Sequence, residues 1–306
     1  MSSVVLLGPQ RSPTLDSVVD DLDLDGPIAT ITAGWQEREP DDDELDHLLD
    51  GRGVNLGLYA RWLDVHERDP EFGAAERRLR VLLDEVQEVY LLRLDHALRA
   101  VHDVQRRTGN RPLDADALEE ALAAVRELDG NHLARIGRVH EEFYDGWPPH
   151  ERPVIAQHRQ EVGRLLAGAG GLVVAGGHIG VLVTTMHTFN VGAALASPVI
   201  AWSAGAMALT ERIVLFHDRA VQGPGNAEVQ GRGLSLLRGV VALPHASSRL
   251  LLHDRDRMSA LARRFAPATC VLLEPGTRID TGTEGRCPVG TRILGVDGHA
   301  VVQEAA

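Results

Sequence analysis

Ser203 lies in the segment A-W-S-A-G, where the strand-like apolar run at 198–202 turns into a helical one. A serine in a sharp strand-to-helix turn has a strained backbone and an exposed hydroxyl. Small residues two positions before and after it let the helix approach the neighbouring strand closely. The free N–H groups of the helix start stabilise negative charge there. The pentapeptide predicts a nucleophile or, equally, a serine that caps the helix.

A serine nucleophile needs a base, and two of the 14 histidines follow Ser203 at strand-like ends. His217 follows R-I-V-L-F, and His245 follows G-V-V-A-L-P. Because an apolar strand and a proline precede His245, this histidine belongs to a loop at a strand end. That is the place expected for a catalytic base, so the pattern favours His245.

The third group of such a site is a carboxylate that orients the imidazole. Asp218 ends the strand that follows the expected nucleophile helix, and Glu274 ends the buried strand T-C-V-L-L-E. Either carboxylate could reach the histidine. The residues by themselves leave this choice open.

Backbone donors for an oxyanion are expected in A-G-G-H-I-G, which follows another apolar strand. A Gly-Gly turn leaves its N–H groups unobstructed, so Gly177 could act together with the N–H of Ala204. A phosphate-binding loop is disfavoured because the G-x-G-x-x-G spacing is absent. Arg249 is a candidate contact for a substrate carboxylate, or else a surface ion-pair residue. His178 is a second candidate contact for the substrate.

These groups need a sheet that brings several strand ends together. Apolar strands at V-V-L-L-G, I-A-T-I-T-A-G, G-L-V-V-A-G-G, P-V-I-A-W and T-C-V-L-L-E alternate with helical segments. The alternation predicts an α/β fold with a doubly wound, mainly parallel sheet, in which ligands bind at the carboxyl ends of the strands. The final segment T-R-I-L-G-V-D-G-H-A-V-V-Q-E predicts a hairpin with a two-residue turn.

Residues 51–150 have a different pattern. Apolar residues recur at three- and four-residue steps over 74–107 without Pro or Gly, which predicts a long amphipathic helix. G-N-R-P breaks it, and a second helical stretch over 114–143 follows, with Gly130 as a candidate break. We therefore expect an α/β core from residues 1–50 and 151–306, with 51–150 inserted as a long helical hairpin. The hairpin could serve homodimerisation or docking.

Composition narrows the classes of function. The 306 residues carry a net charge of −13, which disfavours nucleic acid as a partner. All 31 basic residues are arginine, which excludes a Schiff-base lysine and a Walker-type phosphate loop. Cys270 and Cys287 suit buried thiols better than a bridge. No apolar run reaches the ~18–20 residues of a membrane span, so we expect a cytoplasmic protein without a membrane partner.

Neither a metal nor another cofactor is expected. The segment E-L-D-H at 44–47 has the Glu-x-x-His spacing of di-iron bundles. It occurs once, whereas those bundles need it twice together with two further glutamates. The acidic run around it is more simply the solvated start of a helix.

The Gly-Gly strand end, W-S-A-G-A and G-R-G-L-S-L-L-R-G-V-V-A-L-P-H at 231–245 together resemble the peptidase E and cyanophycinase family of serine peptidases. That family shares the class I glutamine-amidotransferase-like fold, with serine in place of the cysteine nucleophile. I-A-T-I-T-A-G-W-Q-E-R-E is similar to the second strand of the family and the loop after it. The resemblance covers about 1–50 and 151–303.

The resemblance implies Ser203 as nucleophile, His245 as base, and Gly177 and Ala204 as oxyanion donors. The cyanophycinase-like pattern places the acidic residue near Glu274. The peptidase E pattern places it fifteen residues after the serine, at Asp218. The spacing between serine and histidine resembles the cyanophycinase side and favours the glutamate. His178 stands where the family carries Asn or Asp-Gln.

The activity that the resemblance implies is hydrolysis of amide bonds in small or acidic peptides. Two other hypotheses remain beside it. One is a non-catalytic amidotransferase-like scaffold that uses the helical insertion for dimerisation or docking. The other is an esterase of the α/β-hydrolase type, with Asp218 as its acid, although that elbow carries Gly where Ala201 stands.

Overall fold

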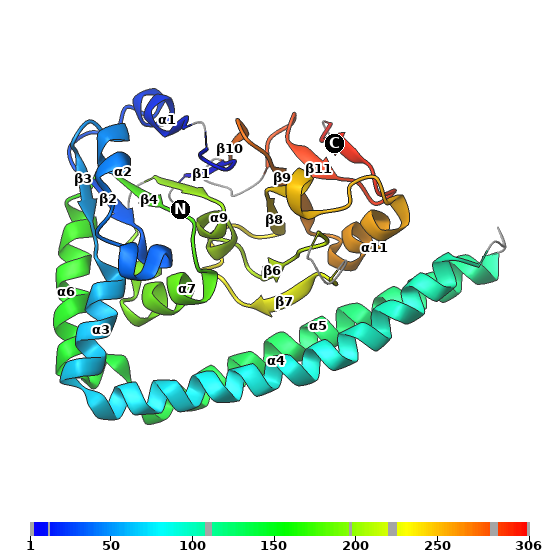
Figure 1. Cartoon of the computed structure of the whole chain (residues 1–306), viewed down its shortest axis with the longest axis horizontal. Coiled ribbons are helices and arrows are strands. Elements are labelled where there is room, and N and C mark those ends of the chain that lie inside the picture. Colours follow the sequence, from blue (N-terminus) through cyan, green and yellow to red (C-terminus); the bar gives the residue numbers. More distant parts are fainter. Residues whose placement is uncertain are drawn as a thin grey trace.

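The computed structural model describes residues 3–11, 13–107, 112–195, 198–219, 225–281 and 287–304. A mainly parallel six-stranded sheet forms the centre of the mixed α/β structure (Figure 1). Five of its strands are parallel, and β10 pairs antiparallel with β1 at one edge. In spatial order the strands are β10 (Arg278–Asp280), β1 (Val4–Leu7), β5 (Val199–Trp202), β4 (Gly171–Val174), β2 (Ile28–Ile31) and β3 (Gly53–Asn55).

Helices cover both faces of this sheet, as a doubly wound arrangement requires. Because side chains alternate along a strand, Val5 and Leu7 face one cluster of buried residues, and Val4 and Leu6 face another. The first face carries α1 (Leu15–Asp21) and α2 (Asp43–Leu48). The second face carries α3 (Leu58–Arg68), α6 (Pro153–Ala167), α7 (Ile179–Thr188), α8 (Val191–Ala194) and α9 (Ala204–Ala208).

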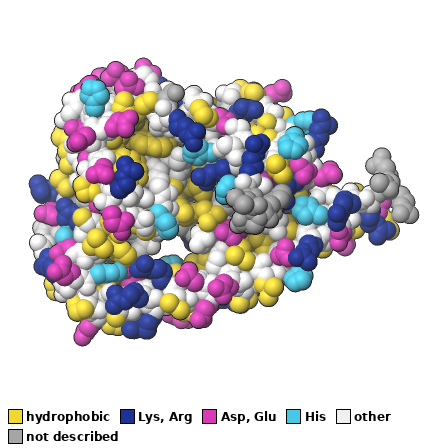
Figure 2. Space-filling model, in the orientation of Figure 1, with side chains coloured by type: hydrophobic (Ala, Val, Ile, Leu, Met, Phe, Trp, Pro, Cys, Tyr) yellow, Lys and Arg dark blue, Asp and Glu magenta, His cyan; other side chains and the backbone are white. Residues whose placement is uncertain are grey.

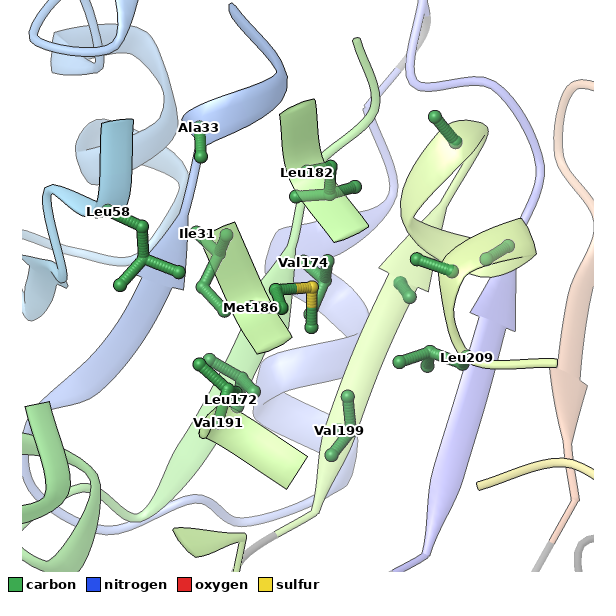
Figure 3. Close-up of a cluster of buried hydrophobic side chains, with 14 of the residues drawn as sticks. Ile31, Ala33, Leu58, Leu172, Val174, Leu182, Met186, Val191, Val199 and Leu209 are labelled. Atoms are coloured by element: carbon green, nitrogen blue, oxygen red, sulfur yellow. The ribbon is translucent and has the colours of Figure 1, made fainter. Parts of the chain in front are cut away.

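Aliphatic side chains make up most of the core on the second face. Figure 3 shows Leu182 and Met186 of α7 lying over Ile31 and Val174 of the sheet. All four are fully buried. Their burial fixes α7, and with it the turn between β4 and α7 that carries Gly177.

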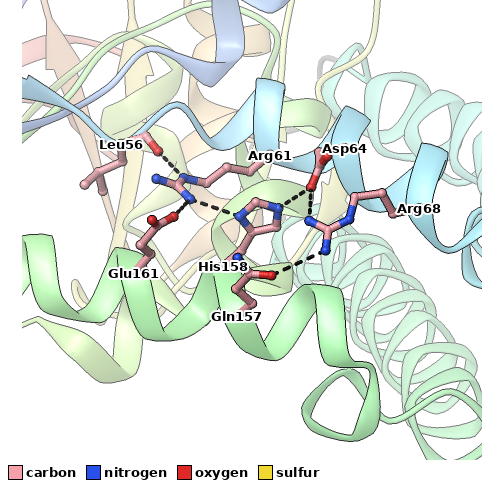
Figure 4. A network of polar contacts seen from close by, with 7 residues as sticks. All are labelled: Leu56, Arg61, Asp64, Arg68, Gln157, His158 and Glu161. Carbon is pink, nitrogen blue, oxygen red and sulfur yellow. Dashed lines mark hydrogen bonds and ion pairs between the residues drawn. The ribbon is translucent and has the colours of Figure 1, made fainter.

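A polar network joins α3 to α6 at the edge of this face (Figure 4). The His158 ring lies between Arg61 and Asp64, with its Nδ1 2.9 Å from Arg61 NH1 and its Nε2 2.7 Å from Asp64 Oδ2. Arg61 also pairs with Glu161 and donates to the carbonyl oxygen of Leu56. The contact with His158 holds the pKa of Asp64 below its usual value. The network fixes the two helices against each other.

A second sheet of four strands follows the turn at Ser203 in the chain. Its order is β12 (Ala300–Val302), β11 (Arg292–Leu294), β9 (Thr269–Leu273) and β8 (Val240–Pro244). Strands β8 and β9 are parallel, and β11 and β12 form the expected C-terminal hairpin. The other elements of this half are β6 (Ile213–Leu215), β7 (Glu228–Gly231), α10 (Ala246–Arg249) and α11 (Arg255–Phe265).

Two long helices, α4 (Pro70–Gln105) and α5 (Pro112–Gly146), run beneath the rest of the molecule in Figure 1. The remaining short elements are the 3₁₀ helices η1 (Ala33–Arg38) and η2 (Pro149–Glu151). Asp69 caps α4 by accepting from the N–H of Phe72, and Pro70 occupies the first helical turn. The break expected at G-N-R-P falls mostly on residues outside the described ranges.

Two expectations for residues 51–150 differ from the structure. The first part of the segment belongs to the α/β core, because β3 pairs with β2 and Trp62 of α3 packs in the main core. The hairpin itself begins with α4 at Pro70. Gly130 does not break α5, which runs continuously through it. A glycine inside a helix costs about 1 kcal/mol, and the buried neighbours Leu128 and Leu133 offset this cost.

The hairpin contacts the rest of the protein at two separate places. Near the ends that join the core, the Phe72 and Phe143 rings lie 5.8 Å apart and pack against the main core. Farther along, Leu94 and Val125 belong to a cluster with the second sheet and α11. The hairpin therefore bridges the two halves of the molecule.

Cys270 and Cys287 are free thiols, the first of them buried. Burial raises the pKa of Cys270 to about 12 and that of Cys287 to about 11.

None of the helices in the described ranges combines the length and the apolar content that a bilayer crossing needs.

Candidate active site

Ser203 occupies the turn between β5 and α9 with φ 51° and ψ −124°. This conformation is rare for a residue with a side chain and costs of order 1–3 kcal/mol. A Cβ atom on Gly205 would lie 2.3 Å from the carbonyl oxygen of Val174, so α9 packs directly on the end of β4. The small residue two positions after the serine is therefore required by the close packing of the turn.

His245 directly follows β8 and has a left-handed backbone conformation, with φ 57°. Its N–H donates to the carbonyl oxygen of Leu273, which ties it to the end of β9. The Nε2 atom lies 3.2 Å from Ser203 Oγ. At this distance the serine hydroxyl can donate its proton to a neutral imidazole.

The surroundings of His245 keep its ring neutral. Burial lowers the pKa of this imidazole, and the positive charges of Arg249 and Arg11 lower it further. The negative charge of Glu274 acts in the opposite direction. An imidazole with a pKa below its usual value of about 6.5 is unprotonated at neutral pH, as a general base must be.

Glu274 lies near His245, but its hydrogen bonds go to Ser247. Its two carboxylate oxygens accept from the N–H of Ser247 at 2.6 Å and from the Ser247 hydroxyl at 2.7 Å. Ser247 lies two residues after the histidine, at the start of α10. The carboxylate is thus held near the imidazole, and it acts on His245 through its charge.

Asp218 is engaged elsewhere. It is 5% exposed and accepts from Arg257 at 2.6 Å and from the N–H of Leu251 at 3.1 Å. Arg257 belongs to α11, so this ion pair attaches the loop after β6 to that helix. His217, the other candidate histidine, directly precedes Asp218 in the chain.

The Gly-Gly turn after β4 lies directly beside Ser203. A Cβ atom on Gly176 would lie 2.9 Å from Ser203 Cβ and 3.7 Å from the Ala204 nitrogen. Gly177 is exposed and has φ +118°, a conformation that favours glycine. The N–H of His178 donates to the carbonyl oxygen of Gly34 at 2.7 Å and holds the turn in place. The turn thus brings Gly176 against Ser203 and Ala204, and Gly177 is the next residue of the same turn.

The two candidate substrate contacts, His178 and Arg249, are both exposed. His178 is exposed, and its Nδ1 accepts from the N–H of Val181 at 3.2 Å, which leaves its Nε2–H as a free donor. Arg249 is exposed beside His245, and none of the ion pairs among the described residues involves it.

Sequence reasoning missed three residues of this site: Arg11, Gly176 and Ser247. Arg11 follows β1 in the chain and acts on His245 from there. Arg11 could have been predicted from its place just after the first strand, because the carboxyl ends of parallel strands share one edge of a sheet. Nothing in the sequence pairs Ser247 with Glu274.

Within the described residues, no group of three or more His, Cys, Asp or Glu side chains is placed to hold a metal ion.

No family model matches the chain, and no curated protein matches it. One solved structure with a similar arrangement is the crystal structure of a peptidase from an acI-B1 Actinobacterium. The two chains are 12% identical with a TM-score of 0.45, over 100% of this chain and 95% of that one.

Proposed function

We propose that the protein is a serine hydrolase that cleaves amide bonds in small peptides with a carboxylate near the scissile bond. The observation that carries this proposal is the 3.2 Å approach of Ser203 Oγ to His245 Nε2, with the serine in a strained turn at the end of a parallel strand. A cap serine needs no basic partner, and Ser203 makes no side-chain capping bond to its helix.

In the proposed mechanism, Ser203 Oγ attacks the amide carbonyl carbon while His245 Nε2 takes the hydroxyl proton. The N–H groups of Gly177 and Ala204 receive the negative charge that forms on the carbonyl oxygen. The C–N bond then breaks, and His245 gives the proton to the leaving amine. A water molecule releases the acyl group by the same route, with His245 again acting as base.

We assign the acidic position to Glu274. Its carboxylate is held beside His245 by Ser247, and its charge favours the imidazolium that forms during the reaction. Asp218 is neutralised by Arg257 and serves the packing of its loop. The exposed guanidinium groups of Arg249 and Arg11 favour a substrate carboxylate near the scissile bond, in keeping with acidic peptides.

This assignment supports membership of the peptidase E and cyanophycinase family, with a class I glutamine-amidotransferase-like core. In that case the α4–α5 hairpin is an insertion into the hydrolytic core. Its attachment between two core elements, α3 and η2, agrees with this interpretation.

The test is labelling with a fluorophosphonate probe, followed by mass spectrometry of the labelled peptide. We expect a single adduct on Ser203, its loss in Ser203→Ala, and unchanged labelling in Ser17→Ala, which alters an exposed serine of α1. Hydrolysis of a panel of short acidic peptides should fall by about 10⁴-fold or more in Ser203→Ala. A wild-type protein that is neither labelled nor active on the panel would favour the scaffold hypothesis.

A further inference from the structure

A cavity of about 450 Å³ lies between the α4–α5 hairpin and the α7 side of the core. In Figure 2 the surface is hollowed at this place, above the two long helices. The cavity falls in the range of about 300–1,000 Å³ that small-ligand sites occupy. Its wall is formed by α3, α4, α5, α7 and the β6–β7 pair.

The way the hairpin packs explains why this space is open. The hairpin touches the main core through Phe72 and Phe143, and the second sheet through Leu94 and Val125. Between these contacts, Glu76 and Arg80 of α4 still meet Trp62 of the main core, and the residues of both helices beyond them line the open space. Gly137 is one of these residues, and a Cβ atom there would meet nothing within 4 Å.

The wall is mainly aliphatic with a few neutral polar groups. Apolar side chains come from both long helices and from α7, among them Leu83, Ile136 and Val183. His140 and His187 also line the cavity, and burial lowers the pKa of both, so they are neutral at pH 7. Protein surrounds the His187 side chain, but the side chain is exposed to the open space of the cavity that it lines.

The charged groups of the wall balance one another. Glu76 accepts from the Trp62 ring nitrogen at 2.9 Å, and Arg80 lies 3.8 Å from the same carboxylate. Asp84 and Arg232 add one charge of each sign. The cavity therefore suits an uncharged ligand that is mostly apolar and offers some hydrogen-bonding groups.

The cavity begins at the catalytic turn. His178 lines it, and Gly176, two residues earlier, contacts Ser203. Two residues span at most about 7.6 Å between Cα atoms, so a substrate bound at Ser203 reaches the cavity within two or three residues. The free Nε2–H of His178 stands at this entrance.

We propose that this cavity binds the apolar part of the peptide substrate, two or three residues with aliphatic or aromatic side chains beside the scissile bond. Their backbone amides hydrogen-bond to the neutral imidazoles and to Tyr144. An alkyl chain would bury those polar groups without partners, which costs about 1–3 kcal/mol each. The inference rests on the proposed function, because it takes Ser203 as the nucleophile.

The test fills the cavity through Gly137→Phe. Gly130→Phe is the matched control, since Gly130 lies two turns earlier on nearly the same side of α5 but is exposed and outside the cavity. The reference substrate is an aspartyl anilide without any extension. The test substrates carry Leu-Phe, Ser-Asn or a decanoyl chain, attached either to the aspartyl amine or to the aniline ring. We expect Gly137→Phe to lower kcat/KM for the Leu-Phe peptides at least tenfold. The unextended anilide and the labelling of Ser203 should stay within twofold.

A second measurement does not depend on catalysis. Fluorescence anisotropy of a Leu-Phe-containing peptide should report binding to Ser203→Ala, and this binding should weaken at least tenfold when Gly137→Phe is added. The proposal is overturned if Gly137→Phe changes neither quantity, or if Ser-Asn or decanoyl substrates are preferred over Leu-Phe ones. If Ser203 is not labelled but the peptide still binds in a Gly137-dependent manner, the hydrolase assignment fails and the binding site stands.

Discussion

At the scale of the residue, the candidate site depends on two side chains held in unfavourable backbone conformations. Ser203 and His245 both have positive φ, at 51° and 57°. Such conformations persist where the surrounding structure determines them, and they cluster at functional sites. Here the packing of Gly205 on β4 holds the serine, and the bond from His245 N–H to Leu273 holds the histidine.

A single substitution tests whether Glu274 is the carboxylate that acts on His245. Glu274→Gln should lower kcat/KM by about 10²-fold, because the charge that stabilises the imidazolium is lost. The same charge raises the pKa of His245, so its removal lowers that pKa. The acid limb of the pH profile of kcat/KM should therefore move to lower pH.

Asp218→Asn is the comparison for this prediction. It removes a carboxylate bound to Arg257, so we expect a lower melting temperature with kcat/KM and its acid limb unchanged. A large loss of activity in Asp218→Asn, with a normal Glu274→Gln enzyme, would reverse the assignment.

At the scale of the element, one buried cluster attaches the hairpin to the second half of the protein. Arg264 of α11 donates to Asp129 of α5 from Nε at 2.8 Å and from NH2 at 2.7 Å. Tyr90 of α4 donates to the same carboxylate and accepts from Arg264 and from the N–H of Val229. Because Arg264 is 2% exposed, its charge depends on this partner.

Asp129→Asn should therefore lower the free energy of unfolding by about 3–5 kcal/mol, since it leaves a buried guanidinium without a counter-charge. Glu119→Gln, on the same helix, removes a partially exposed pair with Arg263 and should cost less than about 1 kcal/mol. Urea unfolding of the two variants beside the wild type measures both values. Equal losses of unfolding free energy in the two variants would show that the buried cluster stabilises the protein no more than the exposed ion pair does.

At the scale of the whole molecule, the hairpin and the two sheets enclose histidines that must remain uncharged. His132 and His140 of α5 face the rest of the protein, and burial lowers the pKa of both. The unfolded chain binds protons at about pH 6.5, where the folded protein does not. Stability is thus greatest above that pH and falls as the pH decreases toward the folded-state pKa values.

We expect the free energy of unfolding to decrease between pH 7 and pH 5.5, as measured by urea titration at each pH. The double variant His132→Gln and His140→Gln should show a smaller decrease over the same range. His150→Gln, at an exposed position in η2, should retain the wild-type slope. An unchanged slope in the double variant would contradict this explanation.

Local patterns predicted the elements more closely than the contacts between them. The apolar runs before Ser203 and His245 are the strands β5 and β8, and the long amphipathic stretch is α4. Period and turn chemistry are properties of neighbouring residues, so the sequence contains them directly. The extent of the hairpin was not predicted, because β3 is a short strand whose pairing with β2 involves residues distant in the chain.

The sequence alone determined which residue types stand at the strand ends: a serine between small residues, a histidine after a proline, and two carboxylates that could serve it. Only the tertiary structure decided how they pair. It places Ser203 3.2 Å from His245, Glu274 on Ser247, and Asp218 on Arg257. It also opens the cavity beneath α7. These outcomes depend on the relative placement of distant elements, and packing of the whole chain sets that placement.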